Sequence, residues 1–311
     1  MNHLRTVCLL LIAPALLCIV SSSPVSADEK TPGVKRVRFY TAPAEGGDAS
    51  LLIVPGDYYT AGSPVLSADG EKLAFDGRKS QNGESFQDGK IMVVNADGSD
   101  LEAIGSGVMP SWSPQGKRIA FSQISPTGVA MMRADGSERK LIEERGWGAQ
   151  WSPDGRKIAY SVFNAGKANI RIYDLIEETK TDLFPEGESP YNSLYWNMSW
   201  SPDSNWLCFK GHKTSDNTYD VATVNVAGMK AGYKVHYNHR EAPYADFAWH
   251  PQGDKIVFAA GPQPRQLLQF NPAEDKAPEP LAIKVNGTII GDICFTPDGQ
   301  SLLFNVSGTG E

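Results

Sequence analysis

The residues of this sequence best suited to metal chemistry are its histidines and cysteines, and their spacing argues against a metal centre. His236 and His239 stand three positions apart, which could hold a metal ion on a helix, but no helical pattern or H-E-x-x-H motif accompanies them. We expect a solvated loop there. Cys208 and Cys294 have no further Cys or His at ligand spacing, so they are expected to be buried free thiols.

Motifs for other kinds of active site are missing from the sequence. It contains no phosphate-binding loop, no dinucleotide-binding motif and no G-x-S-x-G elbow. Asp97-Gly98 and Asp135-Gly136 lack the remaining ligand positions of a calcium loop, so they are predicted to be turns. No cofactor and no metal is therefore expected. Paired carboxylates of a glycosidase stay open, because only geometry can reveal them.

The first 27 residues differ from the rest. Arg5 precedes an apolar run from Thr6 to Val20, and Val25-Ser26-Ala27 supplies small residues for a signal peptidase. The pattern predicts a Sec-type signal peptide at 1–27, a linker at 28–35, and a periplasmic or secreted protein without a membrane span after cleavage. A retained anchor is the alternative, although a span needs about 20 apolar residues. The net charge of −7 without a basic stripe argues against nucleic acid as a partner.

A block of ten residues recurs six times and predicts the fold. Its clearest copy, Trp151–Tyr160, reads WSPDGRKIAY: an aromatic residue, a turn, two polar residues and three apolar residues. Pro presets φ and Gly takes a positive φ, so the block is a tight hairpin. Apolar residues on both faces of its second strand indicate burial on both sides. The copies start 39 to 49 residues apart, which is the period of four-stranded propeller blades.

The two ends of the chain are predicted to share one blade. Asp-Gly turns between apolar runs supply a second hairpin in several repeats. Too few residues follow Phe304 for two outer strands, whereas Arg36–Tyr40 and Ser50–Val54 read as strands. These segments should complete the sixth blade and close the ring. The expected fold is all-β: a six-bladed β-propeller of four-stranded antiparallel blades over residues 36–311.

The W-S-P-D-G-x-x-I-A-F block and the N-A-D-G-S turn at 95–99 resemble the repeats of the TolB-like (WD40-like) β-propeller family. The resemblance covers about residues 36–307. It implies the fold and says little about function, because propellers host many activities. Related repeats occur in prolyl-oligopeptidase-type enzymes. Because the repeats fill nearly all of the sequence after residue 35, we expect neither the N-terminal α/β domain of TolB itself nor a hydrolase domain like that of the peptidases.

Candidate binding residues come from two sets of positions. Connections from the outermost strand of one blade to the innermost strand of the next should gather at one end of the channel. Tyr, Trp and Arg, which dominate binding hot spots, are frequent in them: Tyr58, Tyr59, Trp147, Tyr195, Trp196, Tyr237, His239, Arg240 and Tyr244. The second set lies three residues before each block aromatic, at the expected start of the innermost strand: Ser63, Met109, Gly148, Asn197, Asp246 and Asp292. Its last three members could hold a cation or a basic group.

These features favour a monomeric, non-catalytic binding scaffold that recognises an envelope protein, peptide or glycan through these loops. The alternative is a polysaccharide lyase or glycosidase at the channel mouth that uses His239, Asp246 and nearby carboxylates. Convergence of His and carboxylates within hydrogen-bond reach would favour the enzyme. A third alternative is a component of a larger complex with no ligand of its own.

Overall fold

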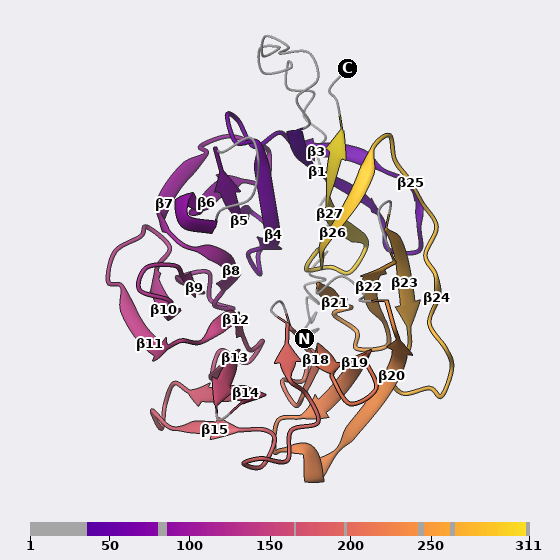
Figure 1. Cartoon of the computed structure of the whole chain (residues 1–311). Helices are drawn as coiled ribbons and strands as arrows, with labels where there is room; N and C mark the ends of the chain where they lie inside the picture. The colour runs from indigo at the N-terminus through magenta and orange to yellow at the C-terminus, as the bar shows by residue number, and fades with distance from the viewer. Residues whose placement is uncertain are drawn as a thin grey trace, which may run out of the picture. The chain divides into compact units, whose positions relative to one another are not determined.

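The computed structural model describes residues 36–79, 86–164, 166–195, 198–241, 246–261 and 265–308. Six antiparallel blades of four strands form a ring, with one strand of each blade facing the axis (Figure 1). We name the strands of a blade a to d from the axis outward. The predicted segments 1–27 and 28–35 lie outside the described residues. No helix in the described part is long and apolar enough to cross a membrane.

The first three blades follow the chain in order. Blade 1 contains β4 (Thr60–Leu66), β5 (Lys72–Arg78), β6 (Lys90–Asn95) and β7 (Glu102–Ser106). Blade 2 contains β8 (Val108–Trp112), β9 (Arg118–Gln123), β10 (Gly128–Arg133) and β11 (Lys140–Glu144). Blade 3 contains β12 (Trp147–Trp151), β13 (Lys157–Asn164), β14 (Lys167–Asp174) and β15 (Lys180–Asp182). Two short 3-10 helices, Phe86–Asp88 and Met229–Ala231, lie in connections of the described chain.

The remaining blades depart slightly from this pattern. In blade 4 strand a is broken into β16 (Ser193–Leu194) and β17 (Ser199–Trp200), followed by β18 (Trp206–Lys213), β19 (Thr218–Asn225) and β20 (Tyr233–His239). Blade 5 contains β21 (Phe247–Trp249), β22 (Ile256–Ala260), β23 (Gln266–Phe270) and the short β24 (Glu279–Pro280). Blade 6 contains β26 (Thr288–Phe295), β27 (Ser301–Gly308), β1 (Arg36–Pro43) and β3 (Ser50–Ile53).

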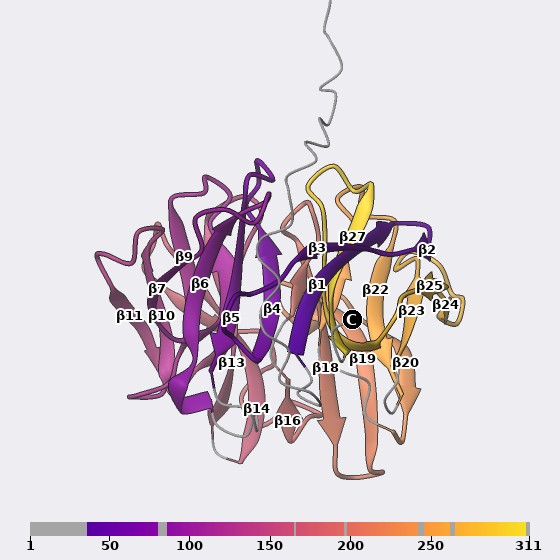
Figure 2. The same cartoon turned by 90° about the horizontal axis from the view of Figure 1, so that it is seen from above.

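The predicted closure of blade 6 by the two ends of the chain is confirmed. β1 pairs with β27 over its whole length, from Arg36 opposite Gly308 to Pro43 opposite Ser301, and β3 pairs with β1. A second link was not predicted: β2 (Gly47–Asp48) runs parallel to β25 (Ile283–Lys284), which follows blade 5 (Figure 2). Blade 6 is therefore attached both through its own sheet and through this outer pair.

The three apolar residues that end each block form the core of every blade. All eighteen have no measurable exposure, as expected for a strand between two neighbouring blades: Leu73, Ala74, Phe75, Ile119, Ala120, Phe121, Ile158, Ala159, Tyr160, Leu207, Cys208, Phe209, Ile256, Val257, Phe258, Leu302, Leu303 and Phe304. Their complete burial accounts for the recurrence of large and small apolar residues in this order.

The block turns of neighbouring blades contact one another. A Cβ on Gly70 would lie 3.9 Å from the Pro297 ring, and a Cβ on Gly253 would lie 3.9 Å from the Pro202 ring. His250 Nε2 is 3.0 Å from the Gly299 carbonyl oxygen. The contact is missing between blades 1 and 2, since no atom lies within 4 Å of a Cβ on Gly116. At this place blade 1 has Ala68 instead of proline.

Candidate binding surfaces: the channel and the loop end

The antiparallel order of strands gives the ring two different ends. The a–b and c–d turns, which include the recurring block turn of each repeat, lie at one end, which we call the turn end. The d–a and b–c connections lie at the other, which we call the loop end. Loops carried on a rigid ring are common places for recognition.

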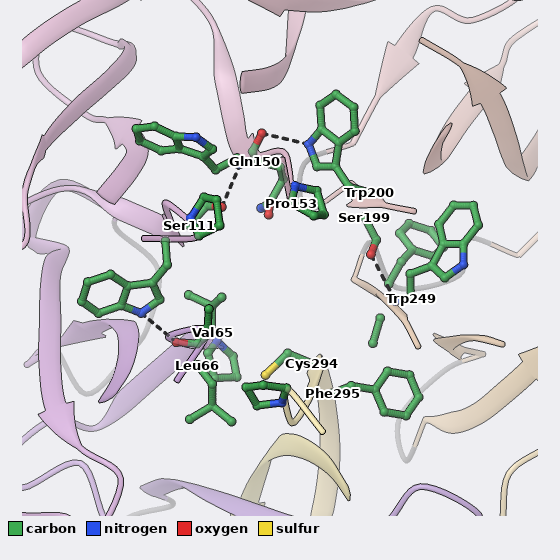
Figure 3. Close-up of a pocket in the computed structure, with 18 of the residues that line it drawn as sticks. Val65, Leu66, Ser111, Gln150, Pro153, Ser199, Trp200, Trp249, Cys294 and Phe295 are labelled. Atoms are coloured by element: carbon green, nitrogen blue, oxygen red, sulfur yellow. Dashed lines mark hydrogen bonds between the residues drawn. The ribbon is translucent and has the colours of Figure 1, made fainter. Parts of the chain in front are cut away.

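A channel of about 470 Å³ runs between the a strands towards the turn end (Figure 3). Its walls include the residue that precedes the block aromatic in each blade: Val65, Ser111, Gln150, Ser199, Ala248 and Cys294. These side chains are small or uncharged. The turn-end rim adds prolines and the edges of the block aromatics, which makes the channel mainly apolar.

Hydrogen bonds between neighbouring blades fix the channel wall. The indole Nε1 of Trp112 donates to the Val65 carbonyl oxygen at 3.2 Å, and that of Trp200 donates to the Gln150 carbonyl oxygen at 3.0 Å. The backbone N–H of Trp151 donates to Ser111 Oγ at 2.9 Å. These bonds are drawn in Figure 3. These polar groups of the wall are therefore engaged in hydrogen bonds between blades.

The described lining of the channel offers little for catalysis. Its titratable side chains are Asp246, which is 3% exposed, and Cys294. Burial raises the pKa of the Cys294 thiol to about 12, so this group stays protonated at neutral pH. A glycosidase requires two carboxyl groups flanking the scissile bond. The described lining supplies one.

The second predicted set lies at a bend of strand a. Ser63 and Met109 adopt positive φ angles of 49° and 57°, and Gly148 one of 69°, at register shifts in β4, β8 and β12. Asp292 lies inside β26, and Asp246 immediately precedes β21. In four blades these positions therefore form a β-bulge inside strand a, where the start of the strand was expected. The extra residue of the bulge bends the strand there. Asn197 lies outside the described residues.

Two predicted tyrosines lie at the loop end where blade 6 meets blade 1. Tyr58 and Tyr59 are partly exposed in the connection from β3 to β4. Lys79 Nζ lies 5.2 Å from the centre of the Tyr58 ring, and the Arg36 guanidinium 5.1 Å from that of Tyr59. Each tyrosine thus has a cation over its ring, an arrangement with modest stabilisation at an exposed site.

The other predicted loop residues lie on blades 3 and 4. Trp147 begins β12 and Tyr195 lies in the break of strand a of blade 4, both partly exposed. Tyr237 stacks on His239 with ring centres 5.7 Å apart, and His239 and Arg240 are exposed. The structure therefore brings these side chains to one end of the ring. Trp196 and Tyr244 lie outside the described residues.

The histidines of β20 and the two cysteines follow the expectations only in part. His236 and His239 do not lie in a loop: both belong to β20, where His236 packs on Phe270 with ring centres 4.7 Å apart. The loop prediction was wrong because the alternation of buried and exposed residues is weak on this outer strand. Cys208 and Cys294 are free, as predicted. Cys208 is buried, whereas Cys294 is partly exposed.

The loop end also includes residues that the sequence reasoning did not select. Phe163 is 61% exposed at the end of β13. His212 and Tyr219 stack with ring centres 4.5 Å apart across β18 and β19, and Tyr219 lies opposite His239 on β20. These residues flank b–c connections, which share an end with the d–a connections. The antiparallel order of strands in a blade predicts this place for residues at the end of strand b and the start of strand c.

Comparisons with known proteins agree on the fold. The chain matches no protein-family model and no curated protein sequence. A structure assigned to TolB from Agrobacterium tumefaciens aligns over 89% of this chain and 99% of its own, with 16% identity and a TM-score of 0.69. TolB from Acinetobacter baumannii aligns over 89% of this chain and 64% of its own, with 17% identity and a TM-score of 0.57. A nidogen/laminin complex aligns with 10% identity, over 87% of this chain and 98% of its own, and a TM-score of 0.60.

These similarities define the class of the protein. Two of these structural neighbours are described as TolB, and this chain is a TolB-like six-bladed β-propeller in fold. At these identities the likeness concerns the fold, and the function has to be argued from the residues of the two ends.

Proposed function

We propose that this protein is an exported, monomeric, non-catalytic scaffold that recognises an envelope protein, peptide or glycan through its loop end. The observation that carries this proposal is the series of aromatic side chains along the loop end of blades 3 and 4. It contains the partly or largely exposed residues Trp147, Phe163, Tyr195, Tyr219 and Tyr237. Aromatic side chains supply large contact area at a small loss of conformational entropy.

The support of these aromatic residues favours recognition of a partner. Four of the five lie on strands, which hold them by hydrogen bonds to neighbouring strands. A preorganised surface loses less entropy on binding than a flexible one. Phe163, which exposes 61% of its surface, is a large apolar group that water solvates poorly.

The lyase or glycosidase alternative receives less support. His239 is exposed on the outer strand of blade 4, whereas Asp246 lies buried at the axis, before strand a of blade 5. Groups that share a proton during catalysis must approach within hydrogen-bond reach. A binding role requires no such convergence.

A capture experiment tests the proposal. The bait is residues 28–311, incubated with envelope extract of the source organism, beside a variant with Phe163→Ala and Tyr237→Ala. The matched control is Ile176→Ala, because Ile176 is 68% exposed at the turn end of blade 3. We expect a partner or glycan captured by the parent and by I176A and lost by the double variant, with unchanged thermal unfolding. Equal capture by all three baits would place recognition elsewhere, and no capture at all would contradict the scaffold.

A further inference from the structure

The residue that follows the block occupies the same place on strand b of every blade: Asp76, Ser122, Ser161, Lys210, Ala259 and Asn305. In three blades this side chain holds strand a of the next blade. Asp76 Oδ2 accepts from the Met109 N–H at 3.2 Å, and Ser122 Oγ accepts from the Gly148 N–H at 2.8 Å. Asn305 Nδ2 donates to a carbonyl oxygen in β4 at 3.1 Å. The position therefore connects neighbouring blades.

Blade 4 places a lysine at this connecting position. Lys210 is 4% exposed, and its Nζ lies 3.6 Å from the centre of the Tyr195 ring and 5.8 Å from that of Tyr219. Met109 and Gly148, the residues held in blades 2 and 3, correspond to Asp246 in blade 5. Asp246 is buried as well and supplies the opposite charge to Lys210. A charge attraction between Asp246 and Lys210 thus acts where three other blades use a hydrogen bond.

We propose that Lys210 is a pH-sensitive positioning residue: while it carries its proton it holds the Tyr195 ring and blade 5 together, and it releases both when it becomes neutral. Resting on the proposed function, this inference makes recognition through Tyr195 stronger below neutral pH than above it. Lys210 itself is too buried to touch a partner, so it acts through Tyr195.

The physical basis is the balance of burial against attraction. Burial lowers the pKa of Lys210 to about 7, with Asp246 opposing the shift and Arg265 adding to it. A protonated ammonium is attracted both to the face of an aromatic ring and to a carboxylate. Loss of the proton removes both attractions at once. In the part of the chain that the structure describes, Tyr195 and Tyr219 also face Lys210, and burial raises the pKa of Tyr195.

Fluorine NMR tests this inference without any partner. Chains labelled with 3-fluorotyrosine are followed from pH 5.5 to 8.5, with the Tyr195 resonance assigned from Tyr195→Phe. We expect this resonance to titrate with a midpoint near 7 and to be flat in Lys210→Met. Because His212 stacks on Tyr219, His212→Gln is the matched control and should retain the titration.

Two further variants test the direction in which the titration midpoint moves, and they do not require K210M to fold. Asp246→Asn should lower the midpoint by about one pH unit, because an opposite charge shifts a pKa by about 1–3 units. Arg265→Gln should raise the midpoint. A Tyr195 resonance that is flat in the parent, or that shifts the same way in both variants, overturns the inference. Failure to capture a partner at any pH would overturn the proposed function and leave this result standing.

Discussion

Replacement of Ala68 by proline should form the contact that is missing between the block turns of blades 1 and 2. In the five other blades proline stands at this position: Pro114, Pro153, Pro202, Pro251 and Pro297. The turn of blade 1 has the same backbone hydrogen bond as that of blade 2, from Gly70 N–H to the Ser67 carbonyl oxygen at 2.8 Å. Its backbone therefore suits proline. The new ring would lie beside Gly116, where no atom now approaches within 4 Å of a Cβ position.

The expected gain has two sources. Proline at a compatible position reduces the entropy of the unfolded chain and stabilises by about 0.4–1 kcal/mol. The two added ring carbons contribute up to about 0.8 kcal/mol each when fully buried, and less here because Ala68 is exposed. We therefore expect a free energy of unfolding raised by about 0.5–1.5 kcal/mol. For a domain of this size this corresponds to a Tm about 1–5 °C higher.

Thermal unfolding by calorimetry and urea unfolding measure this difference. Ala96→Pro, in the c–d turn of the same blade, is the matched control, because the Ala96 N–H donates to the Glu71 carbonyl oxygen at 2.8 Å and proline would remove this bond. The control should be less stable than the parent. If A68P is no more stable than the parent while A96P loses stability as expected, the reasoning about the missing turn contact is refuted.

Three further predictions concern the channel wall and buried titratable groups. Trp200→Phe should lower the free energy of unfolding by about 1 kcal/mol in urea, because it removes the indole bond to the Gln150 carbonyl. Cys208 is buried, and burial raises the pKa of its thiol, so in Cys294→Ser Ellman's reagent at pH 8 should react slowly with the folded protein and rapidly in denaturant; equal rates would contradict this. Burial lowers the pKa of His236 from 6.5 to about 4. The unfolded chain therefore takes up the proton first, and stability should fall from pH 6.5 to 4 by less in His236→Gln than in the parent.

The fold could be predicted because one block encodes several levels of structure at once. Trp151–Tyr160 specifies a turn, a strand and the residues buried on both faces of that strand, and six copies specify the ring. The closure followed from the strands that the last repeat lacks. The pair of β2 and β25 could not be predicted, because two residues on each side carry no periodic pattern.

The place of the proposed binding surface at the loop end could be predicted from the sequence in part, for a similar reason. The d–a loops were recognised by their aromatic residues, whereas the stack of His212 and Tyr219 depends on how far the β18–β19 hairpin extends. The role of Lys210 could not be predicted from the sequence, because lysine is rarely buried. Its burial becomes visible only when the six strands b are aligned and its place between two blades is known.

The pairing of β1 with β27 also determines when the molecule can become complete. Arg36 and Gly308 are neighbours in blade 6 although nearly the whole chain separates them. At a synthesis rate of about 5–20 residues per second, β1 waits roughly 15–50 s for its partner strand. Contacts of such long range slow folding, and during this wait the edge of β1 is open to pairing with other chains. The first strand to be synthesised, β1, is therefore among the last to be paired, and its pairing with β27 completes the ring.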